Sequence, residues 1–205
     1  MVRPLRFVGL LALFTTLTSF AAAQFSMPVS EPKFILATNP KVQDHLKLTA
    51  EQKSKIRSVL EGIMEDDGNG RTMITLNGST SLDDLDKDVL SALDASQLKR
   101  FDQLYCQNAG YLALSREEYA KPLKLSEEQV KQLDAAWEAY QGRLMDFMSS
   151  NGPGSTEMHA TTEQIAKIRL QTKEEVDKIL TPEQIKLWDA SLGEKFEFEK
   201  DKDSI

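Results

Sequence analysis

The chain has 205 residues, 32 of them acidic and 25 basic, so its formal net charge is −7 at pH 7. An acidic surface repels phosphate backbones and anionic lipid headgroups, which argues against nucleic-acid binding and membrane-surface binding. Cys106 is the single cysteine and cannot form a disulfide within these residues; we expect a buried thiol, with a bridge between two copies as the alternative.

The first residues are typical of an export signal. Arg3 and Arg6 precede an apolar stretch over residues 7–20, and residues 21–23 are alanines that suit a cleavage site. The stretch is too short and too rich in threonine for a membrane span, which needs about 20 strongly apolar residues. We therefore expect a signal peptide at 1–23, cleavage after Ala23, no membrane span thereafter, and a periplasmic or secreted protein. Without the two arginines, 23 basic residues face 32 acidic ones, a formal charge of −9.

Helical periodicity dominates the rest of the chain. After an N-terminal extension at 24–39, Asn39 and Pro40 predict a short helix with asparagine as its N-cap. Beyond it, apolar residues recur at intervals of three and four, which is the period of an amphipathic helix. The stripes are Ile56, Val59, Leu60 and Ile63; Leu98, Phe101, Tyr105 and Leu112; Val130, Leu133, Trp137, Tyr140, Leu144 and Phe147; Ile165, Ile168, Thr172, Val176 and Ile179; and Ile185, Trp188, Leu192 and Phe196. Only residues 71–76 favour a short extended segment, so the sequence predicts an all-α fold.

One phrase occurs four times: a leucine, a capping residue, two variable residues and a glutamine. With the second residue at the N-cap of a helix, the glutamine falls at the third helical position, which is the arrangement of a capping box. Each cap contributes about 1 kcal/mol, so helix capping alone accounts for the phrase. Residues 115–118 and 161–164 predict two further boxes. The leucine, capping residue and glutamine of the four copies are Leu48, Thr49 and Gln52; Leu93, Asp94 and Gln97; Leu125, Ser126 and Gln129; and Leu180, Thr181 and Gln184.

The copies are unevenly spaced, which argues against a simple solenoid. The run at 46–49 matches the run at 123–126, and each precedes a long helical stripe. We interpret this as duplication: two antiparallel helical-hairpin halves, 40–112 and 113–199, packed as an elongated bundle and followed by a charged tail at 200–205.

The repeated Leu-Thr-x-x-Gln phrase in an exported helical chain resembles the Spy and CpxP group of periplasmic proteins. The runs at 46–52 and 181–184 carry the resemblance, which covers the phrases and their helices but not the loops. Members of that family are thin antiparallel helical dimers that act as ATP-independent chaperones or as stress-sensor accessories. This chain departs from them in its acidic charge and in carrying two hairpin pairs in one chain.

The resemblance implies a non-enzymatic protein that binds apolar or partly unfolded segments of protein clients, and it is compatible with a homodimer. The alternative is a structural or sensor-accessory protein that engages one specific partner. Our candidate partner-binding stripe is Trp137, Tyr140, Leu144 and Phe147, next to a glycine- and serine-rich loop. Ordinary core packing is the competing explanation for such a regular stripe.

No catalytic or metal-binding pattern stands out. Neither His45 nor His159 has a second histidine or a cysteine at metal-ligand spacing. Residues 65–76 match a calcium loop in part, but the final position is Leu76 instead of the bidentate glutamate. The chain lacks a nucleophile elbow and a glycine-rich phosphate loop. We therefore expect no enzymatic activity, no cofactor and no metal.

Overall fold

The structure, a computed structural model, describes residues 31–66, 72–74, 80–150 and 158–198. The predicted signal peptide, the charged tail and most of the calcium-like loop lie outside these ranges. The elements are α1 (Lys33–Thr38), α2 (Pro40–His45), α3 (Ala50–Leu60), β1 (Met64–Asp66), β2 (Thr72–Ile74), α4 (Leu82–Leu90), α5 (Ala95–Ala109), the 3-10 helix η1 (Gly110–Ser115), α6 (Glu117–Ala120), the 3-10 helix η2 (Lys121–Leu123), α7 (Glu127–Ser150), α8 (Met158–Ile179) and α9 (Pro182–Ser191).

Helices make up nearly all of the regular structure in these ranges, and the predicted all-α fold is confirmed. The short extended segment expected within 71–76 is β2, which pairs with β1 in antiparallel register. This two-stranded ribbon connects α3 to α4, and those two helices pack against each other. The predicted start of the first short helix is also confirmed, because the side chain of Asn39 caps α2 and Pro40 occupies its first turn.

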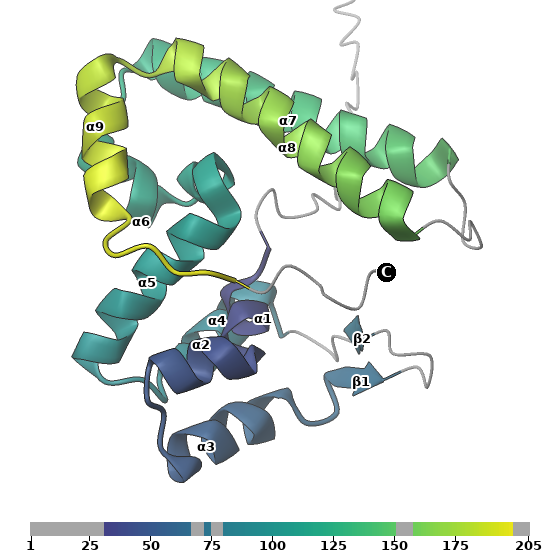
Figure 1. The fold of residues 1–205 in the computed structure, drawn as a ribbon, viewed down its shortest axis with the longest axis vertical. Helices are drawn as coiled ribbons and strands as arrows, with labels where there is room; N and C mark the ends of the chain where they lie inside the picture. Colours follow the sequence, from purple (N-terminus) through teal and green to yellow (C-terminus); the bar gives the residue numbers. More distant parts are fainter. Residues whose placement is uncertain (1–30, 67–71, 75–79, 151–157, 199–205) are drawn as a thin grey trace, which may run out of the picture.

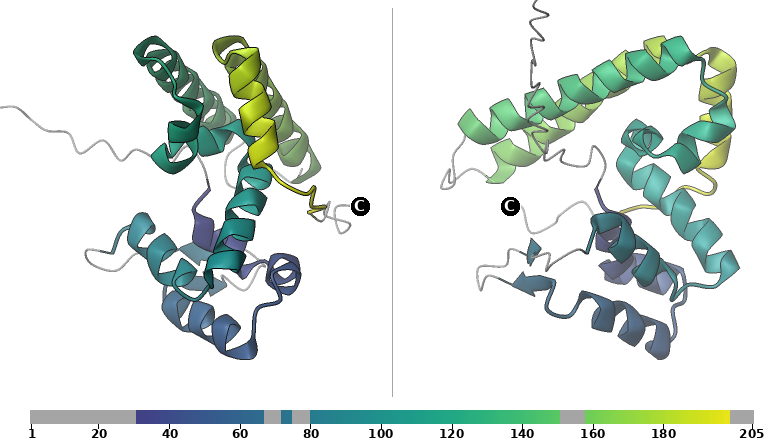
Figure 2. Two further views of the ribbon diagram at one scale, coloured as in Figure 1. Left: turned by 90° about the vertical axis from the view of Figure 1, so that its left-hand side faces the viewer. Right: turned by 180° about the vertical axis from the view of Figure 1, so that it is seen from behind.

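The helices are arranged as a body and an arm (Figure 1). Helices α7 and α8 pack side by side along their length and form the arm. Helices α1 to α4 gather at the opposite end of the molecule, and α5 runs from that group toward η1 and α6. The view from behind shows the same separation (Figure 2). Since η1 contacts both α7 and α8, it is the point at which the arm meets the body.

The core is centred on α5. Its side chains Phe101, Leu104 and Tyr105 have no exposed surface, and Phe34 of α1 is equally buried. The residues before α2 were predicted as an extension, yet α1 is part of the core and packs on α3, α4 and α5. Deleting α1 would therefore expose core residues, whereas deleting a peripheral extension would not.

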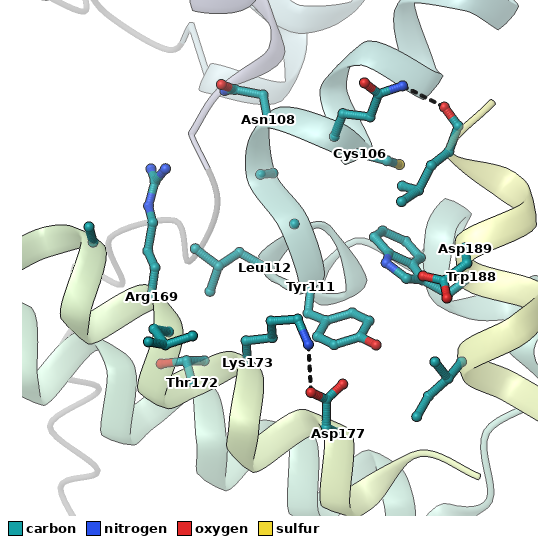
Figure 3. A pocket seen from close by; sticks show the side chains of 17 residues that line it. Cys106, Asn108, Tyr111, Leu112, Arg169, Thr172, Lys173, Asp177, Trp188 and Asp189 are labelled. Atoms are coloured by element: carbon teal, nitrogen blue, oxygen red, sulfur yellow. Dashed lines mark hydrogen bonds and ion pairs between the residues drawn. The ribbon is translucent and has the colours of Figure 1, made fainter. Parts of the chain in front are cut away.

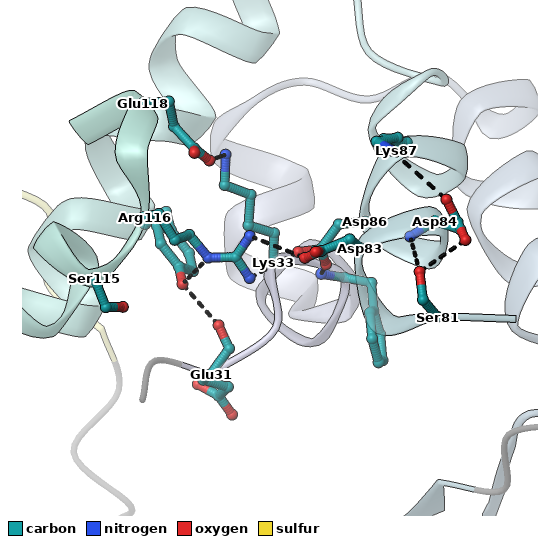
Figure 4. A network of polar contacts seen from close by, with 12 residues as sticks. Glu31, Lys33, Ser81, Asp83, Asp84, Asp86, Lys87, Ser115, Arg116 and Glu118 are labelled. Carbon is teal, nitrogen blue, oxygen red and sulfur yellow. Dashed lines mark hydrogen bonds and ion pairs between the residues drawn. The ribbon is translucent and has the colours of Figure 1, made fainter. Parts of the chain in front are cut away.

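A network of charged groups holds α1 in place (Figure 4). Asp86 of α4 is buried, and its carboxylate accepts the main-chain N–H of Phe34 at 2.8 Å and an Nη2–H of Arg116 at 2.9 Å. Lys33 Nζ lies 3.1 Å from Asp102 Oδ1 and 3.2 Å from Glu118 Oε1. The buried charges are thus compensated within the network, as the low polarity of a protein interior requires.

Two predicted stripes run beyond the ends of their helices. Helix α5 ends at Ala109 because Gly110 has a positive φ of 59°, so Leu112 lies in η1. Helix α9 ends at Ser191, and Gly193 has a φ of 67°, which glycine adopts without steric cost. The chain then runs along α5 as a strap, residues 192–198, because Gln107 Nε2 donates to the carbonyls of Leu192 at 2.7 Å and Glu194 at 2.8 Å.

Candidate functional site

The four repeated phrases all begin helices, as the sequence predicts. Complete capping boxes are present at the starts of α3, α5 and α9. At the start of α7, the Gln129 N–H donates to Ser126 Oγ at 3.2 Å, and the Ser126 N–H donates back to Gln129 Oε1 at 3.0 Å. The box predicted at 115–118 is wrong. The Ser115 hydroxyl donates to the Leu112 carbonyl inside η1, and α6 begins after Arg116. Residue 161 lies inside α8, so the box predicted at 161–164 does not begin a helix.

The glutamines of the four boxes also meet in pairs. Gln52 Nε2 donates to Gln97 Oε1 at 2.6 Å, and Gln97 Nε2 donates to Gln52 Oε1 at 3.2 Å. Each amide then reaches a main-chain carbonyl before the other helix. Gln52 donates to Ala92 O at 2.8 Å, and Gln97 donates to Leu46 O at 3.2 Å. The pair therefore joins the start of α3 to the start of α5.

The second pair repeats this arrangement at the base of the arm. Gln129 Nε2 donates to Gln184 Oε1 at 2.7 Å, and Gln184 Nε2 donates to Gln129 Oε1 at 3.1 Å. Gln129 also donates to Ile179 O at 2.9 Å, and Gln184 to Leu123 O at 3.1 Å. We call the two arrangements glutamine joints. The second joint ties the start of α7 to the start of α9, at the end of the arm where α7 begins and α8 ends.

The joints explain why the third helical position of each box is glutamine and not glutamate. A capping box accepts glutamate as well as glutamine at its third position. Only an amide also carries N–H groups that donate across to a carbonyl. The presence of glutamine in all four copies was the sequence signal for this donor role. The capping explanation did not reveal the role, because it accounts for glutamine and glutamate equally.

The backbone before the joints repeats as well. Lys47 and Lys124 are the non-glycine residues with positive φ among those described, at 53° and 48°. Each follows the residue whose carbonyl receives an amide across its joint, Leu46 or Leu123. The left-handed residue turns the chain into the capping box that follows. The two joints are thus alike in local geometry, whereas the duplication of whole hairpins stays a prediction.

The candidate stripe on α7 lies largely in the core. Trp137 is 6% exposed and Tyr140 is 5% exposed, while Leu144 and Phe147 are partly buried and pack against the same cluster. Beside them, Arg143 of α7 donates to both carboxylate oxygens of Glu175 of α8, at 2.7 and 2.9 Å. These hydrogen bonds hold the pKa of Glu175 below its usual range. In this conformation the four stripe residues help hold α7 to α8, and a partner could reach Trp137 only if the arm opened.

A groove lies where the arm meets the body, between the C-terminal end of α5, η1, α8 and α9 (Figure 3). Its cavity has a volume of about 550 Å³, within the usual range of ligand-binding pockets. We call it the arm groove. The Tyr111 and Trp188 rings lie in it, with their centroids 5.6 Å apart. Its main apolar lining residues are Tyr111, Leu112, Leu170, Ile185, Trp188 and Leu192.

Comparisons with models of protein families, with curated proteins and with solved structures found no match to this chain. The resemblance to the Spy and CpxP group therefore rests on the repeated phrases and stays a prediction.

The charges in the arm groove are partly paired. Lys173 Nζ lies 2.6 Å from Asp177 Oδ2, and Figure 3 shows this pair beside Tyr111. Burial, followed by a hydrogen bond to Asp177, raises the pKa of the Tyr111 hydroxyl, so this group stays neutral. Arg169 and Asp189 also line the groove, and neither has an ion pair among the described residues. The groove thus combines an apolar wall with two charges of opposite sign, Arg169 and Asp189, that have no ion pair with the part of the chain that the structure describes.

Sequence reasoning did not identify this groove. Tyr111 and Leu112 follow a helix end, Leu170 is off the stripe of α8, and Trp188 was interpreted as part of a stripe. Leu170 is 56% exposed, and the position of this leucine outside the apolar stripe of α8 was a local sequence signal for the groove.

The expected burial of Cys106 is confirmed. Burial, with Asp102 nearby, raises the pKa of its thiol to about 12. Because the thiolate is the reactive form, we predict that Cys106 of the folded protein resists alkylation at about pH 8. The same protein unfolded in urea should react at the rate of an ordinary thiol. Mass spectrometry of iodoacetamide-treated samples measures the difference, and rapid labelling of the folded chain would contradict a buried neutral thiol.

The remaining candidates give no site. His45 is exposed and its Nε2 accepts a hydrogen bond from Arg100 Nε at 2.9 Å. The His159 side chain lies outside the described part of the chain. Within that part, no three His, Cys, Asp or Glu side chains are grouped so that they could hold a metal ion. In the same residues, no helix is both long and apolar enough to cross a membrane.

Proposed function

We propose that this protein is an exported, non-enzymatic binding protein that takes up apolar or partly unfolded segments of other proteins in the arm groove. The observation that carries the proposal is the groove itself: an open cavity of about 550 Å³ with two aromatic rings and several aliphatic side chains. Concave apolar surfaces with a few polar groups are the usual form of binding sites. The proposed site thus differs from the stripe on α7, most of which is engaged in the core.

Substitution of one groove residue tests this proposal against a matched control. Leu170 and Leu187 are 56% and 55% exposed on helices, but only Leu170 lines the groove. Burying a leucine side chain contributes about 1.5–3 kcal/mol, so Leu170→Asp should weaken segment binding roughly tenfold. Leu187→Asp should bind as the wild type does, although it makes the same change in charge.

The assay follows light scattering while a chemically unfolded model enzyme is diluted into buffer with each variant. Wild type and Leu187→Asp should suppress aggregation at substoichiometric amounts, and Leu170→Asp should not. If the wild type has no effect at several-fold excess, or if both variants lose activity equally, the proposal is wrong. A pull-down that returns one dominant stoichiometric partner would favour the alternative of a structural or sensor-accessory protein.

A further inference from the structure

The arm groove contains a hydrogen-bond donor that an occupant would cover. Trp188 is 5% exposed, and its indole nitrogen is on the side that faces Tyr111 (Figure 3). The structure gives this N–H no hydrogen bond to any described residue, and its nitrogen is open to solvent from the groove. Once an occupant covers it, the N–H loses that solvent and needs an acceptor, as a buried tryptophan N–H usually has one. The Tyr111 hydroxyl, by contrast, lies beside the Asp177 carboxylate, which raises its pKa after the effect of burial. An occupant of the groove should therefore bring a hydrogen-bond acceptor to Trp188.

Arg169, which is exposed, supplies the second group that an occupant can pair with. It extends from α8 on the side of the groove away from Trp188 (Figure 3) and has no hydrogen bond or ion pair to a described residue. Near this end, Asn108 donates to Glu31 Oε2 at 3.3 Å, so the carboxylate of Glu31 already has a partner. Asp189 lies next to Trp188 at the other end, while Lys173 and Asp177 compensate each other between the two.

We infer that the groove selects segments with an apolar anchor residue, whose main-chain carbonyl accepts from Trp188 Nε1, and an acidic residue on one side that pairs with Arg169. This inference rests on the proposed function and names its substrate class. The apolar anchor would lie among Leu112, Ile185 and the Tyr111 ring. A second acidic residue on the far side of the anchor would meet Asp189 and be repelled, so the preference is for one acidic flank.

Two short, terminally blocked peptides test the pairing with Arg169. They share one apolar anchor and differ at a single flanking position, which is glutamate in one and glutamine in the other. At about 0.15 M salt, screening confines the comparison to charges within about 8 Å. Exposed ion pairs contribute up to about 1 kcal/mol, so the wild type should bind the glutamate peptide about two- to fivefold more tightly.

Arg169→Gln should remove this preference without changing the affinity for the glutamine peptide. Arg57→Gln is the matched control, because Arg57 is exposed on α3 and the change in net charge is the same. It should keep the preference in full. If Arg169→Gln keeps the preference, or if Arg57→Gln loses it equally, the inferred pairing with Arg169 is overturned.

The indole N–H is followed by nuclear magnetic resonance without any substitution. The protein contains two tryptophans, and the Nε1–H signal of Trp188 should move downfield on peptide addition while that of Trp137 stays in place. An unmoved Trp188 signal in the bound state would overturn the carbonyl contact.

Different results would contradict segment binding in the groove and the inferred selectivity for one acidic flank. If the wild type binds neither peptide, the proposed function at this groove fails. If it binds both peptides equally and Arg169→Gln changes nothing, segment binding stands and the selectivity inferred here is wrong.

Discussion

Gln184→Ala is expected to lower the free energy of unfolding by about 3 kcal/mol, since it breaks several hydrogen bonds around a buried amide. Gln184 is 8% exposed. Its loss leaves the Leu123 carbonyl without the Gln184 donor and Gln129 without its amide partner, and it removes the half of the α9 capping box that accepts the Thr181 N–H. Urea denaturation followed by circular dichroism measures the change. Gln132→Ala is the control, because Gln132 is an exposed glutamine of α7 and should cost about 0.5 kcal/mol or less.

A double-mutant cycle separates the joint from the two individual caps. Gln129 and Gln184 contact each other, so their alanine substitutions should be coupled by about 1–2 kcal/mol. Gln52 and Gln184 belong to different joints and share no hydrogen-bond partner, so that pair should be additive within about 0.5 kcal/mol. Additivity between Gln129 and Gln184 would contradict the joint.

Gln184→Glu distinguishes capping from pairing within one residue. Glutamate can still accept the Thr181 N–H and complete the capping box, but it cannot donate to Leu123 or Gln129. We therefore expect Gln184→Glu to be nearly as destabilising as Gln184→Ala at neutral pH. Wild-type stability for the glutamate variant would show that the cap alone matters.

Asp86→Ala should be the most damaging single substitution in the body, with a loss of about 3–5 kcal/mol. The Asp86 side chain is 6% exposed and that of Arg116 is 18% exposed. The substitution leaves the guanidinium without its closest anionic partner and the Phe34 N–H without an acceptor. Because these bonds join α1 and Arg116 to α4, the loss should appear as lower unfolding stability in urea and as faster proteolysis near α1.

Asp83 provides the control on the same arginine. Its carboxylate lies 3.8 Å from Arg116 Nη1, and its side chain is 78% exposed. Asp83→Ala should therefore cost about 0.5 kcal/mol or less, as expected for an exposed ion pair. Asp86→Asn should fall between the two, since the amide oxygen can still accept one N–H. Equal effects of Asp83→Ala and Asp86→Ala would refute the importance of burial.

Local sequence patterns predicted the helices well because their causes are local. A capping residue and a glutamine three positions later satisfy main-chain N–H groups within one turn, so the starts of α3, α5, α7 and α9 could be identified from the sequence. Apolar spacing likewise predicted that α7 buries one face. It could not show what covers that face: Trp137 was a candidate for partner binding with core packing as the alternative, and it lies in the core.

The glutamine joints and the arm groove depend on contacts between residues far apart in the chain. Gln129 and Gln184 meet because α7 and α8 return the chain to its starting point, and no local pattern specifies that distance. In the same way, the groove is formed by the end of α5, η1, α8 and α9 together, and none of them forms it alone. The sequence by itself determined the helix starts at the four repeated phrases and the all-α class, because these follow from residue type and spacing; it favoured the burial of Cys106, which the structure confirms. Only the tertiary structure decided which apolar surfaces stay open, because burial depends on the neighbours that the whole fold brings together.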